Sequence, residues 1–215
     1  MQDKLFESAL GLEAPWFVKG VDFDAQGKRL TIEIDFAPGT RFAVPGDATA
    51  HPVHDTEVKM YRHLNFFQHE CHLRVRTPRV KLPDGSVRLV TPGVAGRLKG
   101  FTLLFEALTV LLAQQMPFAA VARIVGISQF RVMRICRTYV ERALAVADFS
   151  AVKALAIDET SRARGHDYVT LAADAAKRQV IFVTAGRDAQ TIAALAEDLR
   201  AHHCPPEQIE SVSID

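Results

Sequence analysis

Lys153-Ala154-Leu155-Ala156-Ile157-Asp158-Glu159 and Ser211-Val212-Ser213-Ile214-Asp215 are two short apolar runs that each lead to an aspartate. Alternating apolar residues predict a strand in each run. Two further strands are expected between them, at 167–173 and 179–184, joined by a short hairpin connection. Asp188 is placed to cap a helix that runs to about His202. The expected order is therefore strand, strand, strand, helix, strand.

This order is typical of the opening of a ribonuclease-H-like fold, in which the first and fourth strands are neighbours. The two aspartates, Asp158 and Asp215, are then expected to meet. Two carboxylates that close repel each other unless divalent cations lie between them. Mg²⁺ or Mn²⁺ held there would activate a water or a 3′-hydroxyl for phosphodiester chemistry. From the pattern alone, the alternative is that both aspartates are turn residues following strands.

The charge is distributed unevenly along the chain. The formal net charge is +1 over 215 residues, but the stretch from Met60 to Arg142 holds 13 Lys and Arg against 4 Asp and Glu. A basic middle between acidic flanks predicts a polyanionic partner, the alternative being a solvated basic face. Three widely spaced cysteines fit a reducing compartment. With neither a signal-peptide pattern nor a membrane-length apolar run, a cytoplasmic, nucleoid-associated protein is expected, without a membrane partner.

Residues 1–92 are expected to form a small β-rich module of antiparallel strands. The pattern predicts strands at 16–23 and 29–36, a loop at 37–56, and more antiparallel strand over 57–91. Arg74, Arg76 and Arg88 alternate with apolar residues and would share one face. That face is either solvated or in contact with phosphates, and the sequence leaves both open.

Residues 98–148 are expected to form a helix-turn-helix domain after a linker at 91–100. A helix at 101–116 precedes a shorter one that starts at Pro117. Gly126-Ile127 forms the break, and Ser128 caps a third helix that runs to about Ala147. Charged and polar side chains on its outer face are the expected DNA contacts: Ser128, Gln129, Arg131, Arg134, Thr138 and Arg142. The alternative is an ordinary three-helix bundle with a basic face.

Several motifs together resemble the DDE transposases of the ISL3 family of bacterial insertion sequences. In the last third they are Ala156-Ile157-Asp158-Glu159-Thr160, Arg164-Gly165-His166-Asp167-Tyr168, Gly186-Arg187 and Ser213-Ile214-Asp215. Upstream they are His51-Pro52-Val53-His54-Asp55, Tyr61-Arg62-His63-Leu64 and Phe101-Thr102-Leu103-Leu104-Phe105-Glu106-Ala107-Leu108.

The resemblance implies a zinc-ribbon-like module, a helix-turn-helix and a catalytic domain that cuts and rejoins DNA at element ends. Asp158 and Asp215 fall on the family's first two catalytic aspartates and would bind Mg²⁺ or Mn²⁺. The implied partner is double-stranded DNA carrying terminal repeats. A homodimer is one arrangement that the sequence leaves open.

The sequence departs from the family pattern at two places. Val44-Pro45-Gly46-Asp47 and Leu82-Pro83-Asp84-Gly85 stand where paired cysteine motifs are usual, so a four-cysteine zinc site is excluded and zinc is not expected. His51, His54, His69, Cys71 and His72 are the alternative ligand set.

The second departure is that the family's third carboxylate, a downstream glutamate, has no counterpart. Glu159 would point to the opposite face from Asp158. We therefore expect an α+β multi-domain chain whose residues 150–215 form the first half of a ribonuclease-H-like domain. It would be a transposase truncated after its second aspartate, catalytically inactive and able to bind DNA. The alternatives are a non-catalytic DNA-binding protein that represses its parent transposase, and a non-functional product.

Overall fold

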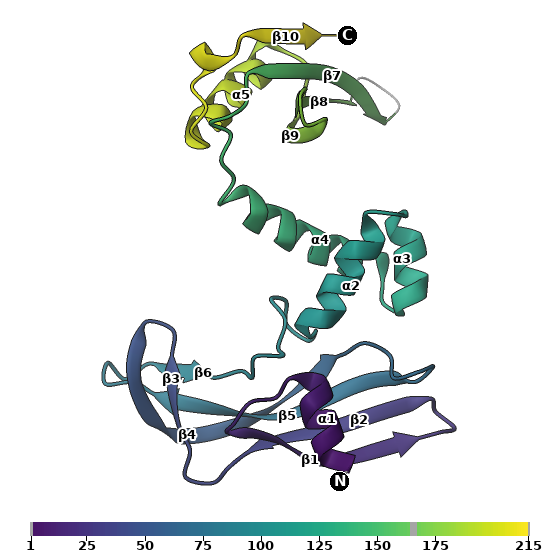
Figure 1. Ribbon diagram of the computed structural model, residues 1–215, viewed down its shortest axis with the longest axis vertical. Helices are drawn as coiled ribbons and strands as arrows, with labels where there is room; N and C mark the ends of the chain where they lie inside the picture. Colours follow the sequence, from purple (N-terminus) through teal and green to yellow (C-terminus); the bar gives the residue numbers. More distant parts are fainter. Residues whose placement is uncertain (1, 164–166, 215) are drawn as a thin grey trace. The chain divides into compact units, whose positions relative to one another are not determined.

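The computed structural model describes residues 2–163 and 167–214, and the chain divides into two compact units. Unit 1 ends at Val140 and unit 2 begins at Glu141. Unit 1 combines a six-stranded sheet with helices, and unit 2 combines a four-stranded sheet with one α-helix (Figure 1). The mixed α and β composition expected from the sequence is confirmed.

The sheet of unit 1 has the order β1-β2-β5-β4-β3, with β6 paired to β5. The elements are α1 (Gln2–Leu10), β1 (Trp16–Asp24), β2 (Arg29–Phe36), β3 (Arg41–Val44), β4 (Asp47–Arg62), β5 (Glu70–Lys81) and β6 (Val87–Leu89). The prediction of a purely antiparallel module is wrong, because β2 and β5 run parallel. The chain passes through the β3–β4 hairpin before it returns beside β2, and β4 is antiparallel to β5. That extra reversal gives β5 the direction of β2.

The loop predicted at 37–56 is also wrong, because this stretch holds β3 and the first part of β4. Phe42 and Val44 alternate with exposed residues and are buried. Gly46 forms the tight turn between the strands with φ +89°, a conformation that glycine adopts without strain. Glycine and proline at the turns give this stretch the composition of a loop. β3 is only four residues long, so its alternation of buried and exposed residues is too short to be recognised in the sequence.

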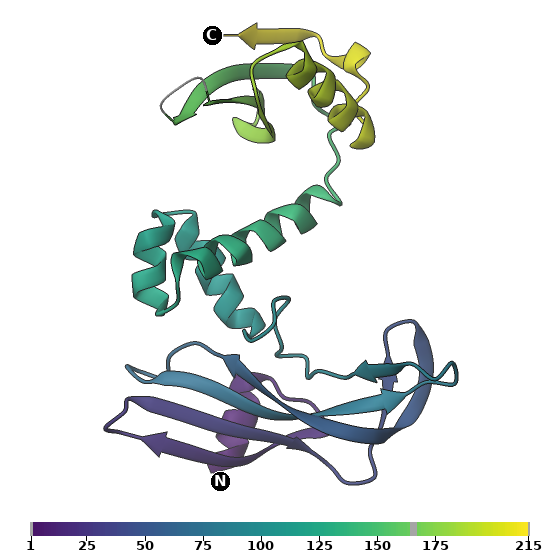
Figure 2. The ribbon, with the colours of Figure 1, turned by 180° about the vertical axis from the view of Figure 1, so that it is seen from behind.

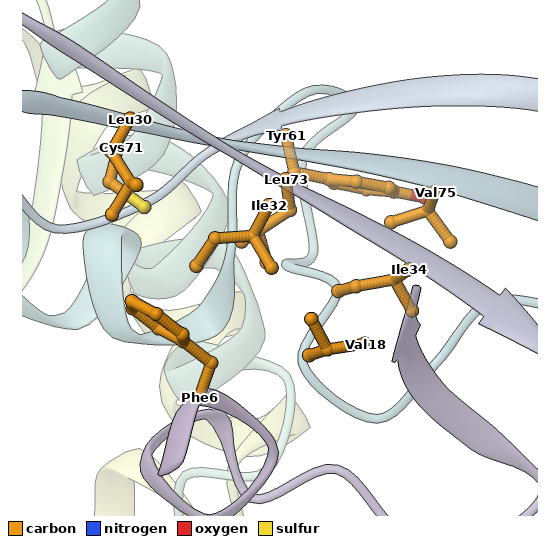
Figure 3. Close-up of a cluster of buried hydrophobic side chains, with 9 residues drawn as sticks. All are labelled: Phe6, Val18, Leu30, Ile32, Ile34, Tyr61, Cys71, Leu73 and Val75. Carbon is orange, nitrogen blue, oxygen red and sulfur yellow. The ribbon is translucent and has the colours of Figure 1, made fainter. Parts of the chain in front are cut away.

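The main core of unit 1 lies where α1 crosses the sheet. Phe6 extends from α1 towards strand side chains that include Leu30, Ile32 and Leu73 (Figure 3). These three strand residues are at most 2% exposed. Burial of each such side chain stabilises the fold by about 1.5–3 kcal/mol. This packing makes the long sheet a firm base for the segment that follows it.

The three helices expected after the sheet are present as α2 (Leu103–Ala113), α3 (Phe118–Val125) and α4 (Gln129–Leu144), seen from behind in Figure 2. Residues 91–100 are not the free linker that their composition suggested. The backbone N–H of Arg62 donates to the carbonyl of Gly100 at 2.9 Å, and Thr102 N–H donates back to the Arg62 carbonyl at 3.1 Å. The end of β4 is thus bonded directly to the start of α2.

Unit 2 has the sheet order β10-β7-β8-β9, in which only the β10–β7 pairing is parallel. The elements are β7 (Ala154–Ala163), β8 (Asp167–Asp174), β9 (Gln179–Ala185), α5 (Ala189–Ala201), the short 3₁₀ helix η1 (Pro206–Gln208) and β10 (Ser211–Ile214). The Asp188 carboxylate accepts hydrogen bonds from the N–H groups of Gln190 and Thr191, so the predicted cap is confirmed. Leu195 and Leu199 of α5 share a core with Leu155 and Ile157. The chain therefore crosses one face of the sheet to place β10 beside β7.

Candidate nucleic-acid interface and candidate metal centre

The turn between α3 and α4 is built as the sequence predicted. Gly126 ends α3 in the left-handed conformation (φ 71°, ψ 33°), and its N–H donates to the carbonyl of Ala122 at 3.0 Å. Ser128 Oγ accepts a hydrogen bond from Arg131 N–H at 3.4 Å, which supplies the expected cap of α4. Val132 and Ile135 of α4 are completely buried in a core shared with Val121 of α3. This core fixes which face of α4 is presented outward.

Most of the predicted DNA contacts lie on that outward face. Ser128, Gln129, Arg131, Arg134 and Arg142 are exposed, and Thr138 is half-buried. The face therefore offers cations for phosphates together with residue types that can bond to base edges.

Arg131 has a second, structural contact that the sequence did not reveal. Its guanidinium lies over the ring of Phe101, 4.3 Å from the ring centroid. Phe101 stacks on Phe105 with ring centroids 5.2 Å apart and an interplanar angle of 4°. The guanidinium of buried Arg62, at the end of β4, lies over Phe105 at 5.3 Å. An aromatic pair carrying a guanidinium on each ring thus links the start of α4 to the sheet.

Two further residues of α4 belong to the candidate interface but were not predicted. Phe130 is 61% exposed at the second position of the helix. Arg137 is exposed one turn after Arg134. A phenylalanine at this position is indistinguishable by sequence from a core residue, and the exposed side of the helix becomes evident only from the packing of Val132 and Ile135.

The arginine face of the unit 1 sheet is largely neutralised by neighbouring acids. Arg74 donates to the carboxylate of Glu33, and Arg76 donates to Asp35 at 2.9 Å. Both acids lie on β2, beside β5. Of the two readings left open by the sequence, these contacts favour the solvated, ion-paired face.

The alternative zinc ligands are dispersed over the unit 1 sheet. His51 bonds to Asp47 at 2.8 Å, and His72 lies 3.4 Å from Glu70. Cys71 is 1% exposed inside the main core, and burial raises the pKa of its thiol to about 11. Within residues 2–163 and 167–214, no three potential metal ligands group together.

The candidate metal centre lies where β10 joins β7. Asp158 is inside β7 rather than at its end, because the strand continues to Ala163. Its exposed carboxylate accepts a hydrogen bond from Glu159 N–H at 2.7 Å. The parallel register places Ile214 opposite Ile157, and these two residues directly precede Asp215 and Asp158. Asp215 itself lies outside the described residues, as do residues 164–166 of the family-like motif.

A glycine turn followed by a capped, outward-facing basic helix places unit 1 in the helix-turn-helix class. A family model described as the helix-turn-helix domain of transposase family ISL3 matches residues 91–140. A second model from the same family, for its DDE transposase domain, matches residues 155–215. The chain belongs to the ISL3 family of transposases.

A curated relative supports the same assignment. The chain is 27% identical over 220 residues to the transposase for insertion sequence element IS1001 of Bordetella parapertussis. That match covers 100% of this chain and 53% of the relative, so the chain spans about half of the relative's length. No solved structure matches the chain. Among the described residues, no helix is both long and apolar enough to cross a membrane.

Proposed function

We propose that this chain recognises the ends of an insertion sequence through α4, and that unit 2 is the first part of a DNA-cutting and DNA-joining domain. The observation that carries the proposal is the exposed face of α4, presented by a capped helix-turn-helix inside the region matched by the ISL3 model. The functional division is 1–92 for the β-rich module, 98–148 for DNA recognition and 150–215 for the catalytic part.

On the DNA side, the partner is double-stranded terminal-repeat DNA. Arg131 and Arg134 lie in the first half of α4, the half that enters the major groove in helix-turn-helix proteins. Arginine bonds to both acceptors of a guanine edge, and glutamine at position 129 suits an adenine edge. Arg142 and Thr138 lie further along and would contact the phosphate backbone. A homodimer would place two such helices on paired half-sites.

On the catalytic side, unit 2 is the opening of a ribonuclease-H-like domain. Its support is the order β10-β7-β8-β9, in which the first and fourth strands of the unit are neighbours, as the sequence predicted. We assign Asp158 and Asp215 as two ligands of a divalent cation. The exposed carboxylate of Asp158 fits this role, because Mg²⁺ and Mn²⁺ prefer oxygen ligands. When bound, the cation would supply charge stabilisation and activation of an attacking oxygen.

The proposed activity of this chain alone is DNA binding without strand cleavage, in the bacterial cytoplasm at the nucleoid. Its match to the IS1001 transposase covers 53% of that protein, so DNA cutting and joining are not proposed for these 215 residues by themselves. We also propose that residues 1–92 stand in the place of the family's zinc-ribbon-like module and fold without bound zinc.

The test is a binding and cleavage assay with duplexes carrying insertion-sequence ends, and with shuffled duplexes as the control. Arg134→Gln with Arg142→Gln should weaken binding by roughly tenfold or more, because each lost phosphate or base contact costs about 1–3 kcal/mol. Asp158→Asn should leave binding unchanged. Equal binding of the parent chain and the arginine variant would refute recognition by α4. Strand transfer by the chain alone in Mn²⁺ would refute the proposed lack of cleavage.

A further inference from the structure

The segment 96–100, here called the basic loop, is held in place by one buried carboxylate. Glu106 of α2 is fully buried, and its two oxygens accept hydrogen bonds from the N–H groups of Arg97 (2.8 Å) and Leu98 (2.7 Å). The hydroxyl of Tyr139 on α4 donates to the same carboxylate at 2.8 Å. The backbone of the loop is therefore tied to two helices of the recognition domain.

The loop also requires glycine where it passes Glu106. A Cβ built at Gly96 would lie 2.4 Å from a Glu106 carboxylate oxygen and 2.7 Å from the Phe101 carbonyl oxygen. The N–H of Gly96 donates to that same carbonyl at 2.8 Å. The loop is thus a fixed part of unit 1 whose shape is set by close backbone packing.

The side chains of this fixed loop leave positive charge in a groove. Arg97 and Lys99 are exposed and line a groove of about 730 Å³ beside residues 57–61 of β4. Within the described part of the chain, neither of the two makes an ion pair. Glu57, the acid in the groove, is paired with Lys59, and its carboxylate also lies within the field of Lys99. Three cations (Lys59, Arg97 and Lys99) against this one acid leave net positive charge in the groove to attract an anionic partner.

The groove adjoins the start of α4. A Cβ built at Gly100 would lie 3.7 Å from a terminal nitrogen of the Arg131 guanidinium. Arg131 is one of the residues placed at the DNA by the proposed function. A DNA backbone bound along α4 would therefore meet the basic loop next, and regularly spaced phosphates suit two cations carried on a fixed backbone.

We propose that the basic loop is a second DNA-contacting element, in which Arg97 and Lys99 bind phosphates of the duplex beside the bases that α4 contacts. Glu106 acts as a positioning residue, because it holds the loop that carries both cations. The contact is independent of sequence, since phosphates carry no base identity. Exposed Val58 and Met60 also line the groove, and an apolar lining suits an extended peptide. The test must therefore distinguish DNA from a peptide as the occupant. The proposal rests on DNA recognition by α4.

The experiment measures the affinity of the full chain for duplex DNA as a function of salt, together with the length of DNA protected from cleavage. Arg97→Gln with Lys99→Gln should reduce the slope of log K against log[salt] by about 2 and weaken binding roughly tenfold or more near 0.1 M salt. The protected region should shorten at one side while base preference stays unchanged. Lys4→Gln with Lys28→Asn, two exposed lysines of α1 and the β1–β2 turn, is the charge-matched control.

The outcomes separate this proposal from the one on which it rests. If the loop variant keeps the parental slope and protected length while Arg134→Gln with Arg142→Gln weakens binding, the loop does not contact DNA and the groove serves another partner. If both variants bind as the parent does, recognition by α4 fails as well. Circular dichroism melting of each variant establishes that any loss is not caused by unfolding.

Discussion

Ile214 lies directly opposite Ile157 in the parallel pairing of β10 with β7, yet the two side chains are 71% and 7% exposed. Ile157 packs into the core beneath α5, whereas Ile214 extends beyond that cover. The same backbone pairing therefore joins a well-packed strand to a lightly packed one.

Alanine substitutions at this pair should have unequal effects on stability. Ile157→Ala should lower the free energy of unfolding of unit 2 by about 2–4 kcal/mol, since it removes buried methyl groups and leaves a cavity. Ile214→Ala should cost less than about 1 kcal/mol. Urea denaturation followed by circular dichroism measures both, and equal losses would contradict the difference in burial.

Acid should destabilise unit 1 through His63. Burial, followed by the nearby charge of Arg62, lowers the pKa of His63 from 6.5 to about 4. Between those two values the unfolded chain takes up a proton that the folded chain does not. The free energy of unfolding should therefore fall as the pH drops from about 6.5 to about 4, by at most ~3 kcal/mol.

The matched variant for this effect is His63→Asn, which can keep a contact with Thr102 in place of the 2.9 Å bond from His63 Nδ1. Burial also lowers the pKa of His72, so the parent should lose stability at both histidines. The variant should show a shallower pH dependence of stability between pH 4 and 6.5. An unchanged slope would mean that His63 does not titrate as stated.

Replacement of Glu106 should loosen the basic loop selectively. Glu106→Gln leaves one acceptor oxygen for three donors, and should cost about 2 kcal/mol in stability. Backbone amides of residues 97 and 98 should exchange with solvent faster, as read by hydrogen–deuterium exchange. Tyr139→Phe removes the hydroxyl donor and leaves both loop bonds, so exchange at residues 97 and 98 should stay near the parental rate.

Alanine substitutions at Arg131 and Arg134 should differ in their effect on thermal stability but should both weaken DNA binding. Arg131→Ala removes a guanidinium from the Phe101 ring and should lower thermal stability, the contact being worth about 0.5–2 kcal/mol. Arg134→Ala should leave the melting temperature unchanged, because the residue is exposed. Both should weaken DNA binding. Loss of stability in both variants, or in neither, would contradict the assigned contact.

Removal of the Asp158 carboxylate should abolish weak Mn²⁺ binding by the full chain. Asp158→Asn keeps the side-chain shape and removes the charge that a divalent cation needs. Water-proton relaxation detects bound Mn²⁺ without any activity measurement. Asp188→Asn is the control, because asparagine also serves as a helix cap. Equal Mn²⁺ binding by both variants would remove Asp158 from the candidate site.

The helices of the recognition domain were predictable from sequence because local signals decide them. Gly126, Ser128 and Asp188 each have one favoured role at a helix end, and each has that role in the structure. Strands with a clear alternation of apolar and polar residues, such as residues 29–36, were equally predictable. These features depend on neighbours within a few residues.

The neighbouring positions of β7 and β10 were predicted from the order of elements, but several other features that depend on distant residues were not. The parallel β2–β5 pairing arises from the path through β3 and β4, and no local pattern encodes it. Residues 91–100 have the composition of a linker, but Glu106 and the end of β4 hold them in place. The role of Arg131 as a stacking residue likewise required the position of Phe101. Proximity of Asp158 to Asp215 stays a prediction, since Asp215 lies outside the described residues.

Because the end of β4 is hydrogen-bonded to the start of α2, the helix-turn-helix domain is not expected to fold well as an isolated fragment. A fragment starting at residue 91, where the family match begins, would lack both Arg62 and His63. Thr102 would lose its backbone and side-chain partners, and Phe105 would lose its guanidinium cover. We expect such a fragment to aggregate or melt early, whereas a piece that includes the whole sheet should remain folded. The smallest fragment that we expect to fold and to carry the whole of α4 therefore runs from the sheet to Leu144.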